Sequence, residues 1–170
     1  MQSVPQNPFT YLRNTFKDTA FRASQYKMIH KLIYTKKLLQ ICGLVDTNIC
    51  DRCNTEIEDF KHLLWDCVYS ANIWKETEKQ IRERYTLKTE LKYHNIIMGV
   101  NPEEYKNHAA INTIIMTIKK ICYMERLKSY EQNTIKNIIE GRIRVEKYAE
   151  RKSGKIISNW DIIQEQHAPD

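Results

Sequence analysis

The sequence predicts a mainly α-helical fold, in which a small helical domain built around a cluster of cysteines and a histidine is followed by a pair of long helices. Glycine and proline are scarce, with four of each in 170 residues, so few positions interrupt regular structure. Three cysteines and one histidine lie between residues 50 and 67 at metal-ligand spacing. Beyond residue 106, two stretches repeat apolar side chains at helical spacing.

The chain is expected to begin with an extended lead-in, residues 1–15, followed by a helix. Asp18 or Thr19 can cap this helix, which is expected to run from Thr19 to about Tyr34. Its apolar positions form roughly one helical stripe and are expected to face the core. They are Phe21, Tyr26, Met28, Ile29, Leu32 and Ile33.

A second, short helix is expected from Lys36 to Ile41. Thr35 can cap its N-terminus, and Gly43 can end it, because glycine readily takes the left-handed conformation at this position. The chain then enters the cysteine cluster directly. Residues 16–85 are therefore expected to form one region, a helix-turn-helix joined to the cluster.

The cluster reads Cys50-x2-Cys53-x8-His62-x4-Cys67. Three thiolates and one imidazole are the ligands of a closed tetrahedral zinc site, so the motif predicts a CCHC zinc knuckle that holds one Zn²⁺ ion. The C-x2-C pair allows two thiolates from one tight turn to reach the same ion. His62 and Cys67 are five residues apart, about 500° around an ideal helix. We therefore expect His62 on a short helix and Cys67 at its end or in a distorted last turn.

Four protein ligands leave no open position for water or substrate, so the zinc is expected to be structural. Asp51 and Arg52, at the tip of the turn, are residue types that a turn tolerates. The alternative is that reduced cysteines pack as small hydrophobic residues, which is how we interpret Cys42 and Cys122. Cys42 precedes Cys50 by only eight residues and is the one plausible substitute ligand.

A further helix is expected from Ser70 or Asn72 to about Tyr85, followed by a polar loop over residues 86–94. The residues of this helix expected to face inward are Ile73, Trp74 and Ile81. The short apolar run HNIIMGV fits a strand or a helical turn, and its periodicity does not decide between them.

Residues 86–170 are expected to form a C-terminal helical region with two long helices. The first is expected from Asn107 to about Tyr130, and the second from about Thr134 to Arg151. The apolar stripe of the first consists of Ile111, Ile114, Ile115, Ile118, Ile121 and Cys122. That of the second consists of Ile135, Ile138, Ile139, Val145 and Ala149. A last docking segment is expected to carry Ile157, Trp160 and Ile163.

The formal net charge of +6 is unevenly distributed, with +5 on residues 1–49, −3 on residues 50–80 and +6 on residues 111–155. Clustered positive charge favours a polyanionic partner such as nucleic acid, although such runs taken alone are usually solvated faces. The basic residues expected to contact phosphate are Arg22, Lys27, Lys31, Lys36, Lys37, Arg142, Arg144, Lys147, Arg151 and Lys152. Three aromatic side chains can stack on bases but are expected to pack in the core instead: Tyr26, Tyr34 and Trp65.

The four ligands and the segments around them resemble the zinc-binding segment of LINE-type (non-LTR) retrotransposon reverse transcriptases, which lies C-terminal to the polymerase. The similarity is close from about Phe16 to Trp74, through QYKMIHKLIYTKKLLQICGLVDTNIC before the knuckle and VYSANIW after it. A looser likeness continues from Asn95 to Trp160. One departure is Val68, where relatives often carry proline after the final cysteine.

This resemblance implies a nucleic-acid-binding module that contacts template RNA or target DNA, RNA rather than DNA being the expected partner, without catalysis of its own. The parent protein would be an RNA-directed DNA polymerase, and the polymerase domain of the same element would be a further partner. The alternative is a zinc-stapled helical docking domain that packs against a polymerase or another protein. Binding that weakens steeply with salt would favour the nucleic-acid-binding module, because phosphate contacts release counterions.

The residue sets that polymerases and nucleases use are not found in the sequence. The Tyr-x-Asp-Asp carboxylates of a polymerase are absent, and the glycines at 43, 99, 141 and 154 stand too far apart to form a phosphate loop. The restriction-like nuclease of some relatives needs an aspartate besides Glu-x-Lys, but none occurs between Asp66 and Asp161. We therefore expect no polymerase, nuclease or hydrolase activity.

The cysteine pattern also bears on the compartment. Five cysteines, an odd number, at metal-type spacing favour a reducing environment over a disulfide framework. The first 30 residues have no apolar run typical of a signal peptide, and no window of 18 uncharged apolar residues is present to span a membrane. The expected location is intracellular, in the nucleus or the cytoplasm, with no membrane partner.

Overall fold

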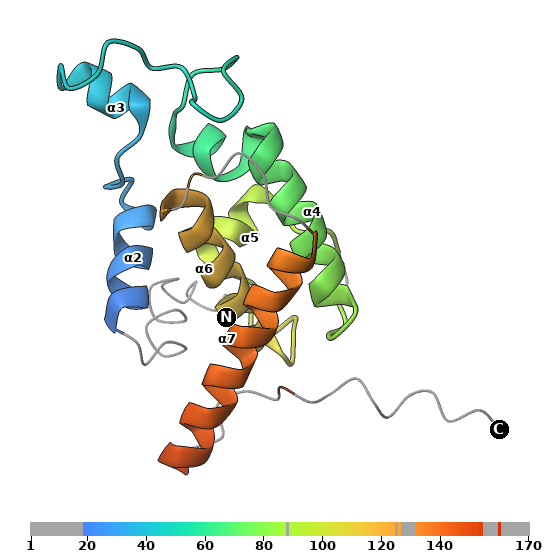
Figure 1. Cartoon of the computed structure of the whole chain (residues 1–170). Helices are drawn as coiled ribbons and strands as arrows, with labels where there is room; N and C mark the ends of the chain where they lie inside the picture. The colour runs from blue at the N-terminus through green and yellow to red at the C-terminus, as the bar shows by residue number, and fades with distance from the viewer. Residues whose placement is uncertain (1–18, 88, 125, 127–131, 155–159, 161–170) are drawn as a thin grey trace, which may run out of the picture.

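The computed structural model describes residues 19–87, 89–124, 126, 132–154 and 160, and the regular structure in these ranges is helical (Figure 1). The elements are α2 (Thr19–Ile29), α3 (Lys36–Ile41), the π-helical turn η1 (His62–Asp66), α4 (Val68–Arg82), α5 (Tyr93–Met98), α6 (His108–Met124) and α7 (Gln132–Ser153). No strand occurs in this part of the chain, which contains one isolated antiparallel bridge between Ile49 and Ile57. The expectation of a mainly α-helical protein is confirmed. The lead-in over residues 1–15 lies outside the described residues.

Helix α6 forms the centre of the hydrophobic core. Every residue from Ala109 to Lys119 is buried, and α2, α4, α5, α7 and η1 all contact this helix (Figure 1). Its side chains are mostly isoleucine, alanine and threonine, so no face is polar enough to lie in water, and a helix of this kind must be covered on all sides. The hydroxyl groups of Thr113 and Thr117 donate to the carbonyls of Ala109 and Thr113, both at 2.8 Å. Each fully buried isoleucine contributes roughly 1.5–3 kcal/mol, so α6 supplies much of the stability of the fold.

A single core joins the two regions that the sequence suggested, 16–85 and 86–170. The buried cluster extends from Phe21 through Trp74 and α6 to Trp160. Trp160 is thus buried as expected, while its expected partners in the tail, Ile157 and Ile163, lie outside the described residues.

Lys119 is a buried cation at the junction of three helices, with only 1% of its surface exposed. Its Nζ donates to Gln25 Oε1 of α2 and to the carbonyls of Ile96 at 2.9 Å and Ile97 at 3.4 Å, which lie in the last turn of α5. Gln25 Nε2 also donates to Ile97 O at 2.8 Å. The C-terminal carbonyls of a helix carry partial negative charge, so they are suitable partners for a buried lysine.

Helix α2 ends at Ile29, so the expectation that it continues to Tyr34 is wrong. Lys31 has a positive φ of 55°, and its amide donates to Met28 O at 3.1 Å, while the next amide, of Leu32, donates to Lys27 O at 2.7 Å. These two bonds form a Schellman motif, which closes a helix with one left-handed residue, here a lysine instead of the usual glycine.

The early end of α2 changes which aromatic and apolar residues are buried. Phe21, Met28 and Ile33 pack in the core as expected. Tyr26 and Leu32 are 54% and 55% exposed, so the prediction that they face the core is wrong. Leu32 is exposed because the chain beyond Lys31 no longer follows the helical period, whereas Tyr26 lies within α2 on a side that does not face the core.

The short apolar run after the polar loop forms helix α5 rather than a strand. Gly99, with φ 84°, ends it, and a Cβ at this position would lie 2.7 Å from Asn112 Oδ1. Asn112 needs that space because its Oδ1 accepts a hydrogen bond from Val100 N at 2.7 Å and its Nδ2 donates to Val100 O at 3.2 Å. Glycine therefore serves both the turn and the close approach of α6.

The two long helices are present, with altered boundaries. Helix α6 ends at Met124, six residues before the expected Tyr130, and Arg126 has a φ of 42° that no α-helix continues through. In α7 the first turns pack through Ile135 and Ile139, but Val145 and Ala149 are exposed, contrary to expectation. The C-terminal half of α7 extends beyond the other described helices, so none of these helices covers that part of the stripe (Figure 1). Among the described helices, none combines the length and the apolar character that crossing a membrane requires.

Candidate metal centre

A tight hairpin-like loop carries the first two cysteines. Cys50 N donates to Glu56 O at 2.8 Å, and Asn54 N donates to Cys50 O at 2.8 Å. Asn54 takes a φ of 55°, a left-handed conformation that asparagine tolerates better than most residues. The loop thereby turns back on itself and directs Cys50 and Cys53 to one point.

The other two groups come from the π-helical turn η1. Asp59 caps it, since Asp59 Oδ1 accepts from His62 N at 2.8 Å and Asp59 O accepts from Leu63 N at 2.9 Å. Cys67 N donates to His62 O at 3.0 Å, a bond between residues five apart that widens the turn. The wider turn rotates Cys67 toward His62. The expected distorted last turn is therefore confirmed as a π-helical turn that ends at Cys67.

The four side chains converge on one point. The Sγ atoms of Cys50, Cys53 and Cys67 and a ring nitrogen of His62 all lie within 4.8 Å of one another. The Cys50 and Cys67 sulfurs are 4.0 Å apart, and Cys53 Sγ is 3.4 Å from His62 Nε2. Cys50, His62 and Cys67 are buried and Cys53 is half-buried. The predicted ligand set is thus brought together, and this group can hold one metal ion.

The surroundings favour a thiolate at Cys53. Burial is the largest single effect and raises the pKa of this thiol, but hydrogen bonds from the Thr55 hydroxyl, from the Thr55 and Glu56 amides and from His62 together outweigh it and lower the pKa to about 6. At Cys67, burial raises the pKa, against smaller opposing effects that include the Arg52 guanidinium. A thiol must lose its proton to bind a metal, so Cys53 is prepared to act as a ligand at neutral pH.

The two remaining cysteines differ from each other. Cys122 is fully buried in α6, and burial raises the pKa of its thiol to about 12, so it packs as a small apolar residue, as expected. Cys42 is exposed, so the expectation that it packs is wrong. It follows α3, a helix in which no residue is buried. Cys42 does not belong to the group of four that converge.

Sequence reasoning missed two charged residues that support the centre. Arg52, expected merely at the tip of a turn, is 3% exposed, and its Nη2 donates to Leu63 O at 2.6 Å. Glu58 is 1% exposed, accepts from Lys36 N at 3.0 Å and forms an ion pair with Arg126 Nη1 at 2.9 Å. Glu58 thereby connects the N-terminus of α3, the cysteine loop and the segment after α6. No local pattern distinguishes these two residues from surface charges, because their partners are distant in sequence.

The predicted phosphate-contacting residues divide into three groups: engaged, half-buried and exposed. Two of them are occupied: Lys36 Nζ pairs with Asp51 Oδ1 at 2.5 Å, and Arg142 lies 4.1 Å from the centre of the Phe21 ring and pairs with Glu146. Arg22 and Lys147 are half-buried. The exposed members are Lys27, Lys31 and Lys37 near α2 and α3, and Arg144, Arg151 and Lys152 on α7.

Exposed tyrosines lie near the exposed basic residues of α2 and α3 and near those of α7. Tyr26 and Tyr34, 54% and 61% exposed, lie beside Lys27 and Lys31 in the chain, so the expectation that these rings pack in the core is wrong. The Tyr26 and His30 rings lie 4.3 Å apart on the outer face of α2. On α7, Tyr148 is exposed, with Lys152 Nζ 5.9 Å from its ring centre. Trp65 is half-buried and packs against the core, as expected.

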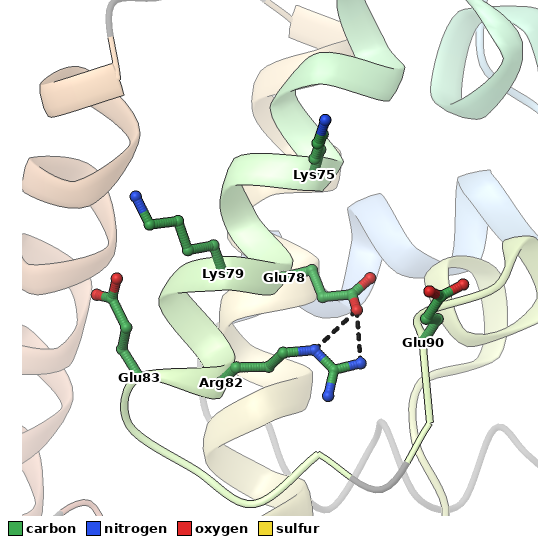
Figure 2. A pocket seen from close by; sticks show the side chains of 6 residues that line it. All are labelled: Lys75, Glu78, Lys79, Arg82, Glu83 and Glu90. Atoms are coloured by element: carbon green, nitrogen blue, oxygen red, sulfur yellow. Dashed lines mark hydrogen bonds and ion pairs between the residues drawn. The ribbon is translucent and has the colours of Figure 1, made fainter.

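A surface groove beside α4 offers no comparable chemistry. Figure 2 shows its lining, which consists of Lys75, Glu78, Lys79, Arg82, Glu83 and Glu90. Glu78 Oε1 accepts from Arg82 at 2.9 Å and 2.7 Å, so these two charges neutralise each other (Figure 2). The remaining mixture of lysines and glutamates favours neither an anion nor a cation.

Comparison of the chain with protein-family models, curated proteins and solved structures finds no match.

Proposed function

We propose that this chain is a zinc-binding, nucleic-acid-binding module without catalysis of its own, and that Cys50, Cys53, His62 and Cys67 hold one structural Zn²⁺ ion. The convergence of these four groups within 4.8 Å carries the proposal. Zn–S distances near 2.3 Å and Zn–N distances near 2.0 Å place the ligand atoms of a tetrahedral centre about 3.5–3.8 Å apart. The observed 4.0 Å between sulfurs and 3.4 Å between sulfur and nitrogen are close to these values.

The donor set also supports zinc over other divalent ions. Three thiolates and an imidazole suit a soft or borderline metal, whereas Mg²⁺ and Ca²⁺ require oxygen ligands. Four protein donors complete a tetrahedron, so the ion would stabilise the fold and would not activate water. Structural zinc contributes on the order of 10 kcal/mol in small modules.

Metal analysis of the purified, untagged chain tests this site. About one zinc per chain is expected. Cys50→Ser should lose the metal, while Cys122→Ser, which changes an equally buried cysteine outside the group, should keep it. Wild-type protein with well under one zinc per chain would overturn the proposal.

The exposed basic residues and their tyrosines support contact with nucleic acid. Lys27, Lys31 and Lys37 can reach phosphates, while Tyr26 and Tyr34 present rings on which unpaired bases can stack. A second stretch on α7 has the same composition: Arg144, Tyr148, Arg151 and Lys152. Stacking on tyrosine requires unpaired bases, so single-stranded or looped RNA suits these surfaces better than duplex DNA. This assignment agrees with the resemblance to the reverse transcriptases of LINE-type elements.

Binding assays with single-stranded RNA, duplex RNA and duplex DNA at two salt concentrations test this part. With about four to six phosphate contacts, the slope of log K against log salt should be roughly −3 to −5. Replacing Lys27, Lys31 and Lys37 by glutamine should weaken binding and flatten the slope without loss of zinc. A matched control replaces three exposed lysines elsewhere, Lys75, Lys79 and Lys106, and should change neither. Equal effects of the two triple variants would contradict the assignment.

A docking domain remains the second candidate, because α3 presents an apolar surface to solvent. Ile41 and Leu44 are 75% and 69% exposed, and α3 projects from the other helices (Figure 1). Under this candidate, zinc would stiffen an arm that packs against a polymerase domain. A chain that ignores RNA and DNA at low salt, yet binds a polymerase domain through Ile41 and Leu44, would decide for docking.

A further inference from the structure

Arg52 is a buried cation without a counter-ion among the described residues. Its side chain is 3% exposed and donates one hydrogen bond, from Nη2 to Leu63 O at 2.6 Å. Its Nε and Nη1 atoms are buried and have no hydrogen-bond partner. None of the ion pairs between described residues includes Arg52. Burying a guanidinium lowers the stability of the fold unless a nearby anion compensates the lost hydration.

The buried guanidinium contacts the π-helical turn that carries His62. In the chain, Arg52 stands between Cys50 and Cys53, and its hydrogen-bond acceptor, Leu63 O, belongs to the residue after His62. Ser70 Oγ donates to the same carbonyl at 2.8 Å, so Leu63 O would keep a partner without Arg52.

The proposed zinc centre would supply the missing anion. Three thiolates, a neutral imidazole and a divalent ion carry a net charge of −1, whereas the same four ligands in their neutral, protonated forms carry none. The nearby cations on the surface are engaged, since Lys36 pairs with Asp51 and Lys61 pairs with Asp66. An anionic centre and an unpaired cation thus occupy the same buried region.

We propose that Arg52 is the buried counter-ion of the metal–thiolate centre, and that its charge raises the affinity of the four ligands for a divalent metal. This inference rests on the proposed zinc site. It also assigns Arg52 opposite effects in two states of the chain. Without metal the guanidinium is an uncompensated buried charge and opposes folding, and with metal it is paired and favours the loaded form.

Two substitutions at Arg52 separate charge from shape. Arg52→Lys keeps the charge and Arg52→Gln removes it, while both lose the planar fork. Zinc affinity of the full chain, measured by competition with a chelating dye, should fall about 10–100-fold in Arg52→Gln, as for other residues that support metal ligands. Arg52→Lys should bind zinc at least about tenfold more tightly than Arg52→Gln. The control Lys61→Gln removes a half-exposed cation next to His62 and should change the affinity by no more than about twofold, because solvent screens exposed charges.

Two further measurements distinguish a counter-ion from a residue that only packs. In the zinc-loaded protein, iodoacetamide should alkylate the thiolates faster in Arg52→Gln than in wild type, because a nearby cation lowers thiolate nucleophilicity. Without metal, Arg52→Gln should unfold at no lower urea concentration than wild type. A residue that only packs would destabilise both forms when replaced and would leave alkylation unchanged.

The outcomes are separable. Wild-type protein that binds no zinc refutes the proposed metal site itself. A zinc-binding wild type with equal affinities in Arg52→Lys and Arg52→Gln refutes the counter-ion role alone. If Arg52→Gln fails to fold with zinc while Arg52→Lys folds and binds, the charge is required and the inference is supported. If neither folds, the shape of arginine is what matters, and the inference is overturned.

Discussion

Replacing Lys119 by methionine should remove a pH dependence from the stability of this protein. Burial lowers the pKa of Lys119 from its ordinary value of 10.5 to about 7 in the folded chain. Between these two values the unfolded chain binds more protons than the folded chain, so the free energy of unfolding rises with pH. Each pH unit in that window is worth at most about 1.4 kcal/mol, and the gain between pH 6 and pH 9 is about 2–3 kcal/mol.

Urea unfolding of the purified protein at pH 6, 7.5 and 9 measures this effect. Stability of Lys119→Met relative to wild type should be highest at pH 6 and should decrease by about 2–3 kcal/mol at pH 9. Methionine leaves the Ile96 carbonyl and Gln25 Oε1 without the donor that Lys119 supplies, and that loss is the same at every pH. The control Lys120→Met changes the next residue, whose Nζ lies 5.2 Å from the Phe21 ring centre, and should shift stability without changing the slope.

Parallel pH profiles of wild type and Lys119→Met would refute the reasoning. The ammonium would then stay charged in the folded protein, held by its three oxygen acceptors, Gln25 Oε1, Ile96 O and Ile97 O. The carbonyl dipoles at the end of α5 would in that case outweigh the cost of burial.

Three other predictions can be tested directly. Lys31→Gly should stabilise the protein by about 1 kcal/mol in urea unfolding, because a side chain disfavours the φ of 55° at this position. The control Lys27→Gly, within α2, should destabilise the protein by about 1 kcal/mol. A loss of stability in both variants would contradict the Schellman motif. Glu58→Gln should lower the free energy of unfolding by about 1–3 kcal/mol, a range that allows for solvent screening because the partner Arg126 is 28% exposed. A decrease below about 0.5 kcal/mol would show that the ion pair is dispensable. The purified chain should neither extend a primer nor cleave RNA or DNA in Mg²⁺, and an activity abolished by replacing a single carboxylate would disprove this.

The candidate metal centre was the part most accessible from sequence. Spacing alone selected Cys50, Cys53, His62 and Cys67, and also required a distorted turn between the last two. Both features are local: a C-x2-C turn and a five-residue separation constrain geometry through the chain itself. The long apolar stripe around Ile114 was equally visible, because a helix buried on all sides leaves a continuous signal.

Helix ends and burial were less accessible. Nothing in the sequence marks Lys31 as a left-handed residue, since that position usually takes glycine, so the predicted helix continued too far and placed Leu32 in the core. In α7, Val145 continues the apolar stripe of Ile135, but it is exposed, because this part of the helix extends past the other described helices. Periodicity identifies the apolar face of a helix, but it does not show how far along the helix other elements pack against that face.

The sequence by itself determined the helical class, the four side chains that converge and the uneven charge, because each depends on residue type and spacing over short distances. The tertiary structure alone decided which charges remain available to a partner. It buries Arg52 beside the ligands, engages Lys36 and Arg142 in internal contacts and leaves Lys27 exposed, although all four are equivalent as positive charges in the sequence. Whether a charged side chain is buried, paired or exposed depends on residues distant in the chain, which the packing of the helices brings close to it.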